Sequence, residues 1–262
     1  MAKKIGMMQP YLFPYLGYFQ LIAAVDEFVL GDDLQYVKEA WINRNRILVN
    51  GKPKLITFPL RKGSHLDKIN ERVLCDEFPY EAEKILRVIS AAYGKAPQYD
   101  TAIALIADIL RHPDRNLARY AENATRRICD YLGIRTPIHI ASDLKIIDVI
   151  DKQDRVIRTA RKIGGETYIN FIGGVRLYDP DRFREAGLTL KFHRIDDIVY
   201  RQFDDEFVPL LSIIDVMMFN SVAEIREMLP RFSLIDAADL AEAKEAGAKA
   251  FYDACALAQA EG

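Results

Sequence analysis

The residues from Gln9 to Phe19 form the densest group that could bind a ligand, and two prolines stiffen this stretch. Five of the ten residues from 11 to 20 are aromatic. A stiff loop presents its side chains to a ligand at little cost in conformational entropy. We therefore expect Gln9, Tyr11 and Tyr15 to contact a substrate, while the other apolar side chains of this stretch are typical of a hydrophobic core.

A second group of polar side chains lies between residues 32 and 46 and contains the single tryptophan of the chain, Trp41. Arginine can bind a phosphate through two parallel hydrogen bonds, so Arg44 and Arg46 are candidates for holding a diphosphate. Trp41 could stack on a sugar or a nucleotide base, and Asn43 could orient a hydroxyl group. The alternative is a polar connection between two strands.

Two residues are candidates for a general base. Asp33 follows an expected strand and could accept a proton from an amine. Histidine side chains titrate near neutral pH, and His65 ends an Arg-Lys-Gly-Ser-His stretch in which Lys62 could contact a phosphate. The alternative for His65 is an incidental position in a polar loop.

A third group lies at the end of another expected strand. Asn170 ends the strand, and Gly173 and Gly174 follow it as a turn. Ligands of open parallel sheets bind beyond the carboxyl ends of the strands, so these three residues are candidates for substrate binding. Ser212 and Asp215 would share one helical face. Because the sequence has no Gly-x-Ser-x-Gly elbow, they are expected to satisfy neighbouring polar groups rather than to act as a hydrolase.

The histidines and cysteines do not have the spacing of a metal site. The four histidines include no His-x-x-x-His pair, and the three cysteines lie far apart without a Cys-x-x-Cys. We therefore expect neither a metal nor a disulfide framework, and the sequence identifies no other cofactor. It also lacks the Gly-x-Gly-x-x-Gly and phosphate-loop motifs of many nucleotide-binding proteins.

The elements that must position these residues begin with a strand over 4–8, a helix over 15–25 and a strand over 28–30. Together they would make one βαβ unit, the building block of a parallel sheet. Further strands are expected over 137–140, 167–170 and 188–192.

A hairpin is expected after the βαβ unit. Asn50-Gly51 is a strong signal for a type I′ turn, and the strands on either side would cover 46–49 and 54–58. A further strand is expected over 69–74.

Helical periodicity begins after Pro79. Helices are expected over 80–93, 98–111, 114–132, 151–163, 206–218, 222–229 and 236–258. The prediction is one large α/β domain over residues 1–262, with a mainly parallel sheet and a β-hairpin. A helical insertion would cover about 79–132, and a C-terminal helical segment about 231–262.

The composition is that of a globular protein, with 262 residues, 50% of them hydrophobic and 28% charged. The formal net charge of −2 argues against a partner held by a global positive field, such as nucleic acid. Lys3 and Lys4 precede an apolar stretch, but glutamines and prolines interrupt it. We therefore expect neither a signal peptide nor a membrane span, and a cytoplasmic location.

A family resemblance covers about residues 3–220. The residues that carry it are Gln9-Pro10-Tyr11-Leu12-Phe13-Pro14-Tyr15-Leu16-Gly17-Tyr18-Phe19, Asp26, Asp33, Gln35-Tyr36, Trp41-x-Asn43-Arg44-Asn45-x-Ile47, Tyr168-Ile169-Asn170, Gly173-Gly174, Leu177-Tyr178 and Leu211-Ser212-Ile213-Ile214-Asp215. With these motifs the chain resembles the WbqC-like family. Phe13 and Tyr15 stand where leucine and tryptophan are expected in many relatives, and both changes keep a large side chain.

The resemblance implies a role in bacterial surface-polysaccharide and O-antigen biosynthesis, with a small nucleotide-linked sugar as the partner. The function expected first is a transferase that acylates or aminoacylates an amino sugar. A second possibility is a non-catalytic binding or scaffold protein of a polysaccharide assembly pathway. A transferase that takes its acyl group from charged tRNA ranks last, because it would need a basic stripe. The oligomeric state is not predicted.

Overall fold

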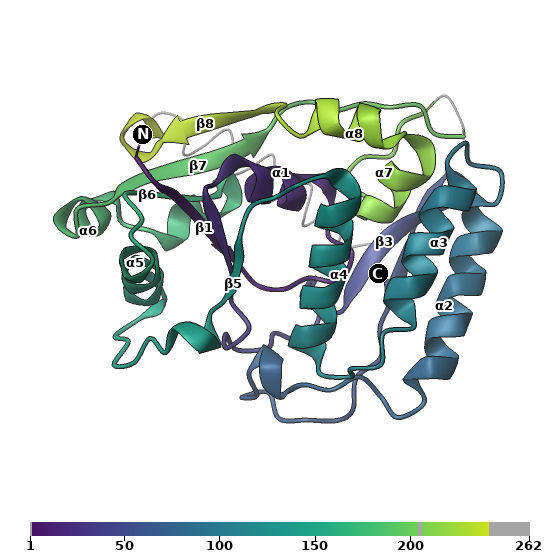
Figure 1. Ribbon diagram of the computed structural model, residues 1–262, viewed down its shortest axis with the longest axis horizontal. Coiled ribbons are helices and arrows are strands. Elements are labelled where there is room, and N and C mark those ends of the chain that lie inside the picture. The colour runs from purple at the N-terminus through teal and green to yellow at the C-terminus, as the bar shows by residue number, and fades with distance from the viewer. Residues whose placement is uncertain (1, 204–205, 241–262) are drawn as a thin grey trace.

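Six strands form one sheet in the order β5-β2-β1-β6-β7-β8 in the computed structural model, which describes residues 2–203 and 206–240 (Figure 1). The neighbouring strands β5, β2, β1, β6 and β7 are parallel to one another, and β8 is antiparallel to β7. The strands are β1 Lys4–Met8, β2 Glu27–Leu30, β5 Ile138–Ile140, β6 Thr167–Phe171, β7 Thr189–Ile195 and β8 Phe232–Asp236. The prediction of a mainly parallel α/β fold is confirmed.

The strand order places a topological switch point between β1 and β6. The chain moves from β1 to β2 and β5 on one side, and continues from β6 to β7 on the other. Counted along the chain, the parallel strands have the order 3-2-1-4-5 of doubly wound sheets. Ligands of such sheets bind in the crevice beyond the carboxyl ends of the strands, at this switch point.

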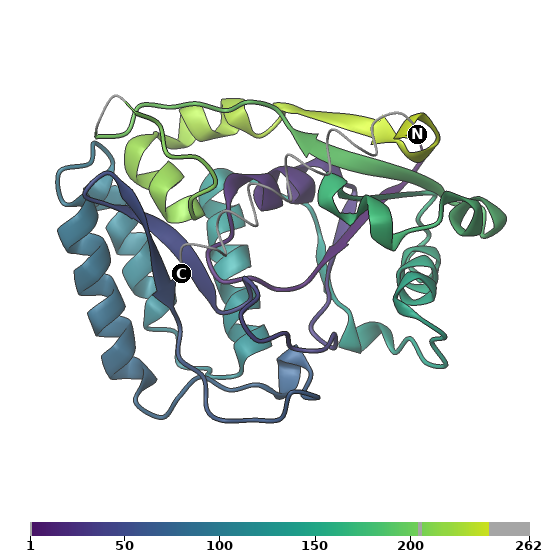
Figure 2. The same ribbon diagram turned by 180° about the vertical axis from the view of Figure 1, so that it is seen from behind.

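Helices cover both faces of the sheet and bury two apolar cores. The larger core lies between the sheet, α1, the α2–α4 group and α7–α8, and the smaller one lies under α5 and α6. Figures 1 and 2 show α2 and α3 at the end of the molecule opposite α6, with α4 nearer the middle. The helices are α1 Leu16–Ala24, α2 Phe78–Tyr93, α3 Tyr99–Leu110, α4 Leu117–Leu132, α5 Lys152–Lys162, α6 Pro180–Glu185, α7 Ile213–Phe219 and α8 Val222–Met228. The predicted helical insertion is confirmed as α2, α3 and α4.

The hairpin is a separate two-stranded sheet of β3 (Arg44–Val49) and β4 (Lys52–Thr57). Its two turn residues have positive φ angles, 51° at Asn50 and 72° at Gly51. Both central residues of a type I′ turn need such angles, so the predicted turn is confirmed.

Three predictions of secondary structure are wrong. The expected strand over 69–74 is a 3-10 helix at Ile69–Glu71 followed by isolated bridges. The expected helix over 206–218 begins only after Ser212, which caps α7 by accepting a hydrogen bond from the amide of Ile214. Part of the expected C-terminal helical segment is strand β8, which adds to the sheet edge at β7. A 3-10 helix follows at Ala237–Asp239, and residues 241–262 lie outside the described residues.

No helix among the described residues is long and apolar enough to cross a membrane.

Candidate functional site

Predicted site residues meet at the switch point of the sheet. Gln9 follows the last residue of β1, while Asn170 lies near the end of β6 and is buried. Gly174 follows in the 3-10 helix Ile172–Leu177 rather than in an open turn, and a Cβ atom there would stand 2.7 Å from Nδ2 of Asn170. The side-chain amide of Asn170 therefore packs closely on Gly174.

The aromatic-proline turn joins this region to the hairpin. The carbonyl oxygen of Phe13 accepts hydrogen bonds from Nδ2 of Asn45 and from the hydroxyl of Ser212, each at 2.7 Å. The amide of Leu12 donates to the carbonyl of Ile42 at 3.0 Å. These contacts place three segments that are distant in the sequence beside one another. Ser212 is a positioning residue here, as the sequence predicted.

The side chains of the turn are partly buried. The hydroxyl of Tyr11 donates to Oε1 of Gln9 at 3.2 Å. The ring of Tyr15 packs on Phe171, with 5.9 Å between ring centres, and covers Gly17 so closely that a Cβ there would stand 2.4 Å from it. Gln9, Tyr11 and Tyr15 thus line the region between the ends of β1 and β6, and each keeps an accessible surface.

The Trp41–arginine cluster, defined as Trp41, Arg44 and Arg46, lies at the start of the hairpin. The Cζ atoms of Arg44 and Arg46 stand 5.7 Å and 5.3 Å from the centre of the indole ring. Within the described residues, Arg44 forms no ion pair with a carboxylate, and its buried Nε has no hydrogen-bond acceptor. Two cations on one aromatic ring make a site suited to an anion that also carries a planar group.

Asn43 has a structural role beside this cluster. Its Oδ1 accepts a hydrogen bond from the hydroxyl of Tyr36 at 2.9 Å, and its Nδ2 donates to the carbonyl of Phe58 at 2.9 Å. Burial raises the pKa of the Tyr36 phenol, so this hydroxyl stays protonated and can donate. Because both ends of the amide are used within the protein, Asn43 orients the hairpin and stands next to the Trp41–arginine cluster.

The two candidate bases have different surroundings. Oδ2 of Asp33 accepts a hydrogen bond from Arg155 of α5 at 2.6 Å, and its Oδ1 is buried without a hydrogen-bond partner among the described residues. The side chains of His65 and Lys62 are exposed on the loop after the hairpin. The His65 backbone carbonyl accepts a hydrogen bond from Gln35, which holds this loop against the 32–46 segment.

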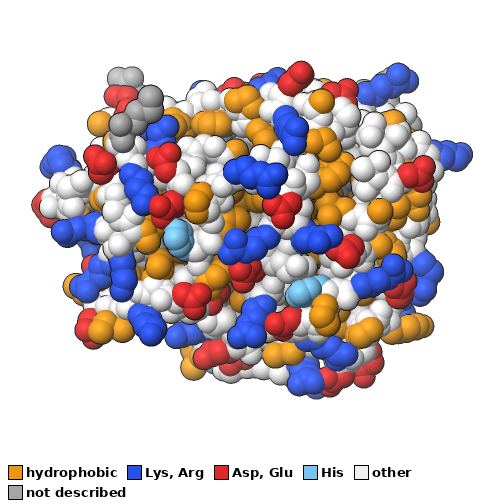
Figure 3. Space-filling model, viewed as in Figure 1, with side chains coloured by type: hydrophobic (Ala, Val, Ile, Leu, Met, Phe, Trp, Pro, Cys, Tyr) orange, Lys and Arg blue, Asp and Glu red, His pale blue; other side chains and the backbone are white. Residues whose placement is uncertain are grey.

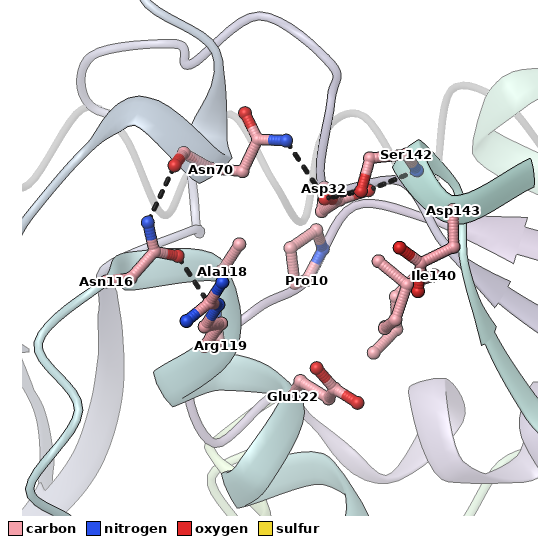
Figure 4. A pocket seen from close by; sticks show the side chains of 11 residues that line it. Pro10, Asp32, Asn70, Asn116, Ala118, Arg119, Glu122, Ile140, Ser142 and Asp143 are labelled. Carbon is pink, nitrogen blue, oxygen red and sulfur yellow. Dashed lines mark hydrogen bonds between the residues drawn. The ribbon is translucent and has the colours of Figure 1, made fainter. Parts of the chain in front are cut away.

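A cavity of about 300 Å³ opens beyond the carboxyl ends of β1, β2 and β5, and sequence reasoning did not anticipate it. We call it the strand-end cavity. Asp32, two residues after the end of β2, lines it and accepts hydrogen bonds from the amide and hydroxyl of Ser142 and from Nδ2 of Asn70 (Figure 4). The other polar side chains that line it are Asn116, Arg119, Glu122 and Asp143.

Only part of this cavity could be predicted from the sequence. Asp32 and Ser142 follow neighbouring parallel strands, a position from which polar side chains can reach a shared ligand. Asn70 and Glu122 come from a 3-10 helix and from α4, and no local pattern indicates that they approach the strand ends. Among the described residues, no group of three metal-binding side chains is close enough to hold a metal ion.

The sheet order and the polar cavity define a doubly wound α/β protein with a ligand-sized cavity at the carboxyl ends of its strands. The model of the WbqC-like protein family matches residues 9–227, so the chain belongs to the WbqC-like family. The chain is also 31% identical over 230 residues to the "Uncharacterized protein Rv1507c" of Mycobacterium tuberculosis, strain ATCC 25618 / H37Rv. That match covers 87% of this chain and 97% of the relative.

Proposed function

We propose that this protein is a transferase that modifies a nucleotide-linked sugar, by acylating or aminoacylating an amino sugar in bacterial surface-polysaccharide biosynthesis. The observation that carries the proposal is the Trp41–arginine cluster, in which Arg44 has no carboxylate partner among the described residues. The cluster stands beside the turn that leaves β1, which is where a doubly wound sheet receives its ligand.

The diphosphate of such a substrate fits the chemistry of this cluster. A guanidinium group binds phosphate oxygens with charge-assisted hydrogen bonds, and a buried donor without an acceptor costs about 1–3 kcal/mol. A phosphate oxygen at Nε of Arg44 would remove that cost. The indole of Trp41 is partly exposed and would stack on the nucleotide base.

Asp33 is the stronger of the two candidate bases. Amide formation joins the amine nitrogen to an acyl carbon, and the amine must give up a proton as that bond forms. Asp33 presents a buried oxygen, Oδ1, that accepts no hydrogen bond from the described residues. His65 would reach a substrate only at the outer edge of the site, because its ring is exposed.

The second candidate function is a non-catalytic binding or scaffold protein of a polysaccharide assembly pathway. The ion pair between Asp33 and Arg155 favours it, because a carboxylate held by a guanidinium can be a purely structural group. If this function is correct, Asp33→Asn and His65→Ala leave the polysaccharide phenotype of cells intact. A charged-tRNA donor gains no support from the face in Figure 3, where the described basic and acidic side chains are interspersed.

Replacing Arg44 by alanine is expected to weaken binding of a nucleotide sugar by about 10- to 100-fold, because a hydrogen bond to a charged group contributes about 1.5–3 kcal/mol. Isothermal titration of the full chain with a panel of nucleoside diphosphates and their sugars measures this. Arg87→Ala is the matched control, since Arg87 is an exposed arginine of α2. The proposal fails if nothing in the panel binds at millimolar concentration, or if both variants bind like the wild type.

A further inference from the structure

The strand-end cavity has the wrong charge for a diphosphate. Among the described residues that line it, Asp32, Glu122 and Asp143 carry carboxylates, and Arg119 supplies the one cation. That cation is already 3.6 Å from Asp114 and is largely exposed. A diphosphate here would face like charges at close range, whereas a cation would be attracted.

Two of the three carboxylates keep capacity to bind a ligand. Oε1 of Glu122 accepts a hydrogen bond from Arg126 at 2.8 Å, but no described residue donates to its Oε2. The carboxylate of Asp143 has neither a hydrogen bond nor an ion pair with another described residue. Asp143 is exposed and lines the cavity. In Figure 4, Glu122 and Arg119 stand on the α4 side and Asp143 on the opposite side. An ammonium group between the two sides could contact Oε2 of Glu122 and the carboxylate of Asp143.

Asp32 has a different role from Glu122 and Asp143. Its Oδ1 accepts from the amide of Ser142 at 2.9 Å, and its Oδ2 accepts from the hydroxyl of Ser142 at 2.7 Å and from Asn70 at 3.0 Å. Asn116 holds Asn70 in turn, since its Nδ2 donates to the carbonyl of Asn70 at 2.6 Å. These bonds hold Asp32 in place. Its carboxylate adds negative charge to the cavity, and its hydrogen bonds are already supplied by the protein.

The volume limits what can enter. Cavities for small molecules measure about 300–1,000 Å³, and this one, at about 300 Å³, lies at the lower bound. It suits a single sugar ring or an amino acid rather than a whole nucleotide sugar. The amide and hydroxyl groups of Asn70, Asn116 and Ser142 would serve the hydroxyl or carboxyl groups of such a ligand.

We propose that the strand-end cavity binds a small molecule through its protonated primary amine, with Glu122 and Asp143 as the ammonium ligands. An amino sugar and a free amino acid share this chemistry, and the experiment below distinguishes them. The inference rests on the proposed function only for the choice of an amino sugar as one probe. It assigns the amine-bearing group to a place separate from the Trp41–arginine cluster.

The test is isothermal titration of the full chain with two pairs of probes, D-glucosamine with N-acetyl-D-glucosamine and glycine with N-acetylglycine. Acetylation removes the charge of each amine, so at least one amine is expected to bind about tenfold more tightly than its acetylated form. A preference for glucosamine identifies an amino sugar as the ligand, and a preference for glycine identifies an amino acid. The proposal is overturned if none of the probes binds at millimolar concentration, or if each amine binds as tightly as its acetylated form.

Glu122→Gln is expected to remove this preference, since it keeps the shape of the side chain and deletes its charge. Glu83→Gln is the matched control, because Glu83 pairs with Arg111 at 2.8 Å on the surface just as Glu122 pairs with Arg126. Amine binding unchanged in Glu122→Gln, or lost equally in the control, contradicts the assignment. Nucleotide binding measured on the same samples reports on the Trp41–arginine cluster, so the two proposals can fail separately.

Discussion

Replacing Asp215 by alanine is expected to lower the free energy of unfolding by about 4 kcal/mol. Asp215 is fully buried and accepts three hydrogen bonds, from the hydroxyls of Tyr93 and Tyr200 at 2.8 and 2.6 Å and from Gln202 at 2.8 Å. Burial raises the pKa of its carboxyl group, and the three donors oppose that shift. Without the acceptor, buried donors lose their partner, at about 1–3 kcal/mol each.

The loss of the hydrogen bonds to Asp215 would also affect the candidate site. Tyr93 also accepts a hydrogen bond from the amide of Leu48 in β3 at 2.7 Å, so the Asp215 network connects α7 and α2 to the hairpin that carries Arg44 and Arg46. Denaturant titration of both proteins measures the effect. Asp130→Ala is the control, since its exposed pair with Arg135 contributes less than about 1 kcal/mol. A loss for Asp215→Ala no larger than that of the control contradicts the importance of this network.

Lowering the pH from 7 to 4 is expected to reduce the free energy of unfolding by up to about 3 kcal/mol through His193 alone. This residue of β7 is 1% exposed, and neither ring nitrogen has a hydrogen-bond partner among the described residues. Its ring lies between Phe171 and Phe232. Burial lowers its pKa from 6.5 to about 4. The unfolded chain therefore binds a proton first, and stability falls as the pH drops from about 6.5 toward 4.

His193→Phe isolates this contribution, because a phenyl ring keeps the aromatic packing and cannot bind a proton. The pH dependence of the unfolding free energy, measured in denaturant at several pH values, should be flatter in the variant by the amount given above. His65→Gln is the control for removing a histidine, since the side chain of His65 is exposed. Parallel curves for His193→Phe and the wild type would contradict a lowered pKa of His193 in the folded protein.

Local signals in the sequence predicted local structure well. Asn50-Gly51 defines a turn through the φ angles of two adjacent residues, and the hairpin follows from it. The positions of Gln9 and Asn170 could also be predicted, because the ends of parallel strands meet at one edge of a sheet. These inferences need only the pattern of strands and helices.

Contacts between distant segments could not be predicted in this way. Arg155, the partner of Asp33, is 122 positions away in the sequence, and nothing in either neighbourhood indicates the pair. Residues 69–74 have a strand-like composition, yet the amide of Ile69 donates to the carbonyl of Leu34 outside any sheet. The same long-range approach of this segment to β2 creates the strand-end cavity, which is why the cavity was missed.

The central claim is that the Trp41–arginine cluster holds the diphosphate of a nucleotide-linked sugar. Electron density from crystals soaked with such a nucleotide sugar tests it most directly. We expect phosphate oxygens within hydrogen-bond distance of Arg44 and the nucleotide base against Trp41. A diphosphate seated among the carboxylates of the strand-end cavity, or bound on any surface away from Arg44, would contradict the claim.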